Sequence, residues 1–284
     1  MVAPVLFDHA LLEARLARRL RLADGVDFLW TRAAEDLVER LAPVLRPFAD
    51  IADIGTPSEA FANALRTIRP QSRITRVTSG PVKRESLDLQ AESLDLIVSG
   101  LVLQHANDLP GALIQIRRAL RPDGLFIGCL LGGATLTELR QSLAEAESAV
   151  RGGVSPRVFP FADVRDIGGL LQRAGFALPV ADSETVTVRY PDLFGLMADL
   201  RAMGGSNVLK ERSRQPTRRA VMLKAAEVYR ERFADPDGRL RATFDILWLS
   251  GWAPHESQQK PLPRGSAKMR LADALGVREQ TGED

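Results

Sequence analysis

Ile51-Ala-Asp-Ile-Gly55-Thr-Pro-Ser-Glu59 is the stretch of sequence that decides the fold. A short apolar run that ends in glycine is typical of a buried parallel strand that feeds a tight turn. A helix is expected directly after it, over residues 58–68, with Ser58 as the N-cap. Strand, turn and helix in this order predict one unit of an α/β sheet.

The same alternation of strand and helix continues to about residue 150. Further strands are expected at residues 73–78, 94–98 and 125–131, and further helices at 110–120 and 135–150. Thr135 and Glu138 have the spacing of a capping box, and Arg121-Pro-Asp-Gly124 has the composition of a turn. With right-handed crossovers, these elements predict a doubly wound, mostly parallel sheet.

The segments on either side of this core are mostly helical. Leu12, Leu16 and Leu20 share one helix face, and a second helix is expected over residues 27–41. The later elements are expected at residues 163–174, 185–190, 193–203, 216–233, 244–252 and 267–275. The predicted organisation is an N-terminal helical segment (1–48), an α/β core (49–190) and a C-terminal lid with the last strand and a tail (191–284).

Composition excludes several classes of protein. Hydrophobic residues make up 45% and charged residues 26%, the balance of a globular chain. The single cysteine, Cys129, excludes an internal disulfide framework and fits a reducing compartment such as the cytoplasm. Apolar runs are shorter than the roughly 18 residues that a transmembrane helix needs. The formal net charge of +2 gives no sign of a nucleic-acid partner.

Ligands of an open parallel sheet bind beyond the carboxyl ends of its strands, where the strand order reverses. Three places in the sequence qualify. Gly55 and Thr56 follow the first strand, Thr78 ends the second, and Ser99 to Leu101 follow the third. These places form the candidate ligand site.

Two side chains just past the third strand are candidates for chemistry. Gln104 and His105 lie there, and His105 is a candidate general base, with a hydrogen-bonded loop histidine as the alternative. His255 and Glu256 are adjacent and therefore face apart, and no third ligand lies near them, so no metal site is expected.

Several longer runs resemble one protein family. They are 107–113 (NDLPGAL), 120–128 (LRPDGLFIG), 132–140 (GGATLTELR), 203–207 (MGGSN), 251–258 (GWAPHESQ) and 264–266 (RGS). In these runs the chain resembles the class I S-adenosylmethionine-dependent methyltransferases. The resemblance is closest to the bacterial relatives of NADH:ubiquinone oxidoreductase complex assembly factor 5. The malonyl-carrier-protein methyltransferases of biotin synthesis are more distant cousins.

The resemblance implies a Rossmann-like methyltransferase fold and modification of a protein side chain, an arginine of a respiratory complex I subunit in the assembly-factor branch. It implies a location in the cytoplasm or at the surface of the inner membrane. It assigns catalysis to Gln104 and His105. The residues that match cofactor positions are Asp53, Gly55, Thr56, Thr78, Ser99 and Leu101.

The cofactor loop departs from the family pattern D/E-x-G-x-G-x-G. Only Gly55 is kept, Pro57 lacks an N–H group, and Glu59 adds a negative charge. The second strand ends without the carboxylate that would bind the ribose, and only 15 residues separate Thr78 from Leu94, too few for a three-turn helix over 81–90. S-adenosylmethionine binding is therefore expected to be weak or lost. Two functions stay open, a protein-modifying enzyme and a cofactor-free assembly factor.

Overall fold

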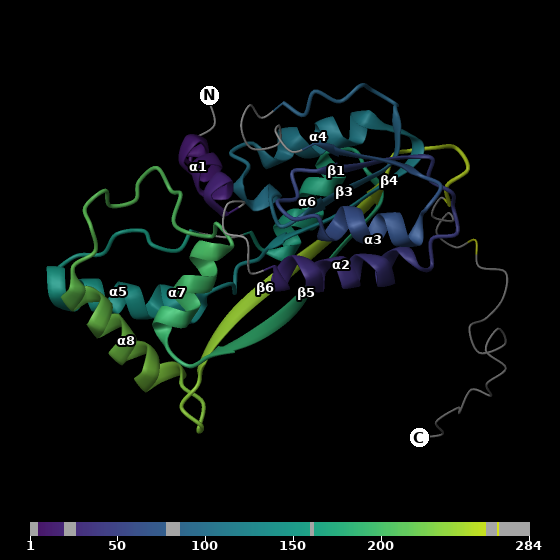
Figure 1. Ribbon diagram of the computed structural model, residues 1–284. Coiled ribbons are helices and arrows are strands. Elements are labelled where there is room, and N and C mark those ends of the chain that lie inside the picture. The colour runs from purple at the N-terminus through teal and green to yellow at the C-terminus, as the bar shows by residue number, and fades with distance from the viewer. Residues whose placement is uncertain (1–4, 20–26, 78–85, 160–161, 260–265, 267–284) are drawn as a thin grey trace, which may run out of the picture. The chain divides into compact units, whose positions relative to one another are not determined.

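The computed structural model describes residues 5–19, 27–77, 86–159, 162–259 and 266 (Figure 1). The chain divides into a large unit, Met1–Pro254, and a C-terminal segment, His255–Asp284. The expected helix over 267–275 lies outside the described residues, as does Thr78. The division into three parts at residues 48 and 190 stays a prediction.

A six-stranded sheet forms the centre of the large unit (Figure 1). Its order is β2-β1-β3-β4-β6-β5, with β1 (Asp50–Ile54), β2 (Arg73–Val77), β3 (Leu94–Gly100) and β4 (Leu120–Leu131) parallel, and β5 (Ala177–Tyr190) and β6 (Leu240–Trp252) antiparallel. The strand order reverses between β1 and β3, so the predicted doubly wound, mostly parallel sheet is confirmed.

Helices cover both faces of the sheet, and each strand sends alternate residues to each face. Ile51 and Val98 pack in the cluster that contains α2 (Phe28–Leu41) and α3 (Ala60–Ile68). Ile54 and Ile97 pack in the opposite cluster, with α4 (Leu109–Ala119) and α6 (Val164–Arg173). This burial of both faces explains why the strands read as continuous apolar runs.

A group of helices packs on the far part of the long β5–β6 pair (Figure 1). These are α5 (Thr137–Arg151), α7 (Leu193–Ala202) and α8 (Arg219–Phe233). Near the N-terminus, α1 (His9–Arg19) packs through Leu12 with Phe159 and Val208. The short 3-10 helix η1 (Leu103–His105) follows β3.

Two expected helix caps are wrong, because other partners take the capping side chains. Helix α3 begins at Ala60 after Glu59, although the Ser58 hydroxyl does accept a bond from the Ala60 N–H (3.2 Å). Helix α5 begins at Thr137 after Leu136, whose φ is +52°. Thr135 bonds instead to the backbone of Asp245 in β6, and Glu138 accepts bonds from Thr243.

The expected turn at residues 121–124 is a large bulge inside β4. Leu120 pairs with Leu94 and Leu125 pairs with Leu96, so the extra residues loop out between two paired positions, with Asp123 at φ +62°. The Arg121 guanidinium donates to Asp95 and Asp50 at the start of β3 and β1, both at 2.8 Å. Residues 86–90 contain no helix, in line with the short connection expected there, and residues 81–85 lie outside the described part.

Gly251 should tolerate no side chain. A Cβ placed on Gly251 in β6 would lie 2.8 Å from the Phe176 Cβ, whereas a Cβ on Gly169 in α6 meets nothing within 4 Å. We expect Gly251→Ala to lower the free energy of unfolding by about 1–3 kcal/mol through overpacking. Gly169→Ala, the matched control, should leave it unchanged or raise it by up to about 1 kcal/mol. Denaturant unfolding of both variants measures this, and equal effects would contradict the packing.

Candidate functional site

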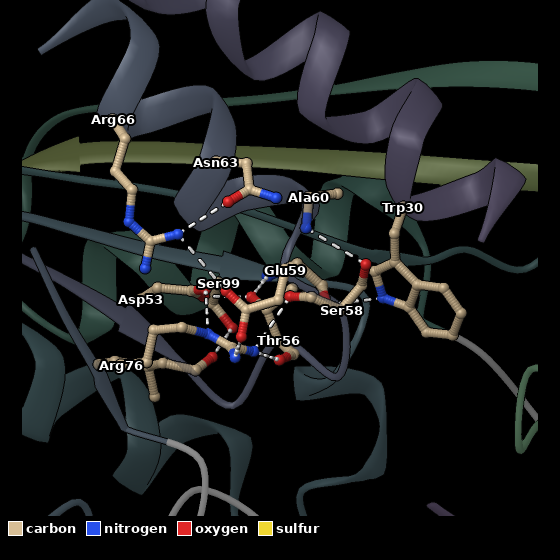
Figure 2. Close-up of polar contacts among 12 residues, drawn as sticks. Trp30, Asp53, Thr56, Ser58, Glu59, Ala60, Asn63, Arg66, Arg76 and Ser99 are labelled. Carbon is tan, nitrogen blue, oxygen red and sulfur yellow. Dashed lines mark hydrogen bonds and ion pairs between the residues drawn. The ribbon is translucent and has the colours of Figure 1, made fainter. Parts of the chain in front are cut away.

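The loop between β1 and α3 is built around one glycine and one arginine (Figure 2). Gly55 has a φ of +71°, and its N–H donates to the Val77 carbonyl (2.8 Å), which ties the turn to the end of β2. Arg76 comes from β2, where it lies opposite Asp53 of β1 in the parallel register. Its guanidinium therefore enters the loop from the side.

Arg76 binds four groups of this loop at once. It donates to the Thr56 carbonyl (2.8 Å) and the Ser58 carbonyl (3.0 Å), and it pairs with the carboxylates of Asp53 (3.4 Å) and Glu59. The Asp53 side chain is fully buried, whereas that of Glu59 is 57% exposed. The arginine thus joins an interior carboxylate to a surface one, and it closes the loop over the end of β1.

Asp53 is the buried centre of this network. Its carboxylate accepts a bond from the Thr56 hydroxyl, which in turn accepts one from the Gly100 N–H (2.9 Å). Desolvation raises the pKa of Asp53 to about 6, although Thr56 and Arg76 both act to lower it. The loop is therefore bonded to three neighbouring strands.

The structure separates the predicted cofactor residues into two groups. Asp53, Gly55, Thr56 and Ser99 lie in the loop network or behind it, with the Ser99 hydroxyl donating to the Ile54 carbonyl (2.9 Å). Leu101, with a φ of +52°, lies just beyond the carboxyl end of β3 and lines a cavity of about 370 Å³.

The cavity begins where the loop ends. Pro57, Leu101, Gln104 and His105 line it, together with Trp30, whose indole N–H donates to the Gly100 carbonyl (3.3 Å). The structure thus brings both predicted catalytic residues beside the end of the cofactor loop. The sequence analysis did not identify Trp30 or Arg76 as residues of the site. For Arg76, the available signal was an arginine in one strand that pairs in register with a buried acid in the next.

His105 packs among aromatic rings and is uncharged. It contacts the rings of Phe7 and Phe159, with centroid distances of 5.8 and 5.3 Å. Burial lowers its pKa to about 4, so the imidazole is uncharged at pH 7. Gln104 donates its amide to the Leu101 carbonyl (2.8 Å), and its buried Oε1 has no hydrogen-bond partner among the residues that the structure describes.

Of the residues that the resemblance assigns to S-adenosylmethionine, two are engaged in bonds inside the loop network. Asp53 and Thr56 are bonded within the chain, and Glu59 holds its charge beside them. Within the described residues, no group of three or more His, Cys, Asp or Glu side chains could hold a metal ion. No helix in the same part of the chain is long and apolar enough to cross a membrane.

The chain is a methyltransferase-domain protein. The family described as "Methyltransferase domain" matches residues 26–179. The chain is 38% identical to "Arginine-hydroxylase NDUFAF5, mitochondrial" of Danio rerio, over 87% of this chain and 82% of that protein. It is 47% identical to the Homo sapiens protein of the same name, over 66% of this chain and 54% of that one.

A third relative is the "Malonyl-[acyl-carrier protein] O-methyltransferase" of Halorhodospira halophila (strain DSM 244 / SL1). It is 30% identical, over 90% of this chain and 91% of that protein. The chain belongs to the methyltransferase-domain family, in the group that contains the NDUFAF5 proteins.

Asp53 should make stability depend on pH. Its folded pKa of about 6 lies above the ordinary 3.8, so the folded state binds the proton more tightly and loses stability as the pH rises from about 4 to 6. Relative to the wild type, Asp53→Asn should gain on the order of 2–3 kcal/mol over that range. Denaturant unfolding at pH 4, 5, 6 and 7 measures this difference.

Asp95→Asn is the matched control, because Arg121 and two backbone N–H groups hold the pKa of Asp95 below its usual value despite its partial burial. Its difference from the wild type should run in the opposite direction. Parallel stability curves for Asp53→Asn and the wild type would contradict the assignment of a raised pKa to Asp53.

Proposed function

We propose that this protein modifies a side chain of a partner protein, with Gln104 and His105 facing the substrate. The observation that carries the proposal is their place: both lie just past β3, at the reversal of strand order, and both line the cavity beside the cofactor loop. A neutral imidazole there can accept a hydrogen bond or a proton from the substrate.

Identities of 38–47% to proteins named arginine hydroxylase support a protein substrate. We propose an arginine of a respiratory complex I subunit as the residue modified, and the cytoplasm or the surface of the inner membrane as the location. Both parts of the proposal rest on these relatives.

The same proposal includes weak affinity for S-adenosylmethionine. Pro57 has no N–H to donate to a cofactor, and the described part of β2 ends without a carboxylate. In addition, Arg76 and Glu59 form an ion pair within the loop. A second function, that of a cofactor-free assembly factor, is favoured by one observation: the buried carboxylate of Asp53 pairs with Arg76 of the same chain.

S-adenosylmethionine should bind with a dissociation constant weaker than about 100 μM, or roughly −5.5 kcal/mol. Restoring the glycine pattern with Pro57→Gly and Glu59→Gly together should tighten binding at least tenfold, because it returns an N–H and removes a negative charge. Calorimetric titration of the purified protein measures both. Glu35→Gly, at an exposed site on α2, is the control. Low-micromolar affinity of the wild type would overturn the weak-binding proposal.

His105→Phe should abolish the modification while keeping the fold. Phenylalanine preserves the ring contacts with Phe7 and Phe159 but offers no nitrogen to the substrate. The measurement is mass spectrometry of complex I subunits, with native gels of the complex, in cells whose own copy of the gene is replaced. The melting temperature of the purified variant serves as the control for folding. Normal modification by a folded His105→Phe protein would remove His105 from the proposed chemistry.

A further inference from the structure

The 370 Å³ cavity has walls that are mostly apolar. Six of its side chains come from six different elements, namely Leu16 (α1), Leu29 (α2), Leu139 (α5), Met197 (α7), Met222 (α8) and Phe244 (β6). A pocket of this size and character suits a small molecule with a sizeable apolar body.

The charged groups that reach the cavity are all cationic. Arg15, Arg157 and Arg201 line it, and none of the described lining residues is acidic. An arginine side chain from a substrate would therefore meet three guanidinium groups and, among the lining residues that the structure describes, no carboxylate. Like charges in a partly desolvated site repel more strongly than in water. The cavity is thus chemically unsuited to a cationic guest, and suited to an anionic one.

The three arginines are not equivalent. Arg157 is neutralised, because it pairs with the buried Glu147 and donates to the Thr217 hydroxyl (2.6 Å). Arg201 is exposed and has no ion pair in the part of the chain that the structure describes. Arg15 is half-buried, and it is the arginine best placed to meet a guest inside the cavity.

Arg15 is a cation without a carboxylate. Its one hydrogen bond goes to the Asn207 carbonyl (2.6 Å), and among the described residues it forms no ion pair. Burial lowers its pKa, and the neighbouring charges of Arg212 and Arg18 act in the same direction, whereas the charge of Asp8 acts in the opposite one. A half-buried guanidinium with unused donors is a ready partner for a planar anion.

We infer that the cavity binds an anionic amphiphile, an apolar chain that ends in a carboxylate or phosphate, with the anion on Arg15 and the chain among the leucine and methionine side chains. This goes beyond the proposed function, because it concerns what the cavity holds and not what the protein modifies. A substrate arginine would then meet Gln104 and His105 where the cavity begins, beside the cofactor loop, and not in the apolar interior.

Calorimetric titration of the full chain with decanoate, decyl phosphate, 1-decanol and decylamine tests the inference. These probes share one chain and differ in the head group. We expect decanoate or decyl phosphate to bind at one site, at least tenfold more tightly than 1-decanol. Decylamine should give no measurable binding. The tighter of the two anions identifies the head group that the site prefers.

Two variants on one helix locate the anion. Arg15→Gln should weaken binding of the preferred anion at least tenfold and leave 1-decanol unchanged. Arg18→Gln, on the exposed side of α1, should change neither by more than about twofold. Met197→Trp should weaken the anion and the alcohol together, because it fills the apolar part of the cavity.

Equal affinity for decanoate, decyl phosphate and 1-decanol would overturn the inference, as would tighter binding of decylamine or equal effects of the two arginine variants. The head-group comparison uses the unaltered protein, so the inference stays testable if Arg15→Gln fails to fold. Loss of protein modification in cells is a separate measurement and does not enter this test.

Discussion

A buried carboxylate at the end of β1 must be neutralised, and the arrangement around the site follows from how this is done. Asp53 is fully enclosed, and an enclosed unpaired charge would cost several kcal/mol. Arg76 supplies the partner from the adjacent strand, and the same guanidinium holds the Thr56 and Ser58 carbonyls. One side chain of β2 therefore contacts both β1 and the loop that leads into α3 (Figure 2).

A second buried acid is neutralised by an arginine in the same way. Glu147 of α5 is buried, and burial opposes its ionisation, yet bonds from Arg157 and Ser155 lower its pKa to about 2. That pairing anchors the segment that carries Val158 and Phe159 into the cavity wall. Two buried acids, each matched by an arginine, thus hold two segments that contribute residues to the cavity wall. Arg15 differs because it forms no ion pair within the described part of the chain, and the inferred preference of the cavity for an anion rests on this difference.

The loop and the cavity differ in which of their groups are free to bind a ligand. The fold places ligands at the reversal of strand order, and here the polar groups at that point bond to one another. The space available to a ligand is the mostly apolar cavity that begins beside the loop, where the neutral His105 lines it. Shared fold and sequence identity place the chain in its family, whereas its activity must be argued from these side chains.

The sequence by itself determined the strands, the parallel sheet and the family, because apolar runs ending in glycine report burial on both faces and need no knowledge of distant partners. It also showed that the loop departs from the family's glycine pattern at Pro57 and Glu59. Only the tertiary structure decided what Thr135, Glu138 and Arg76 do, since their partners lie on other strands and outcompete the local caps and turns that spacing suggests. The cavity is likewise tertiary, because its walls come from helices and strands far apart in the sequence, and its charge depends on which arginines are paired.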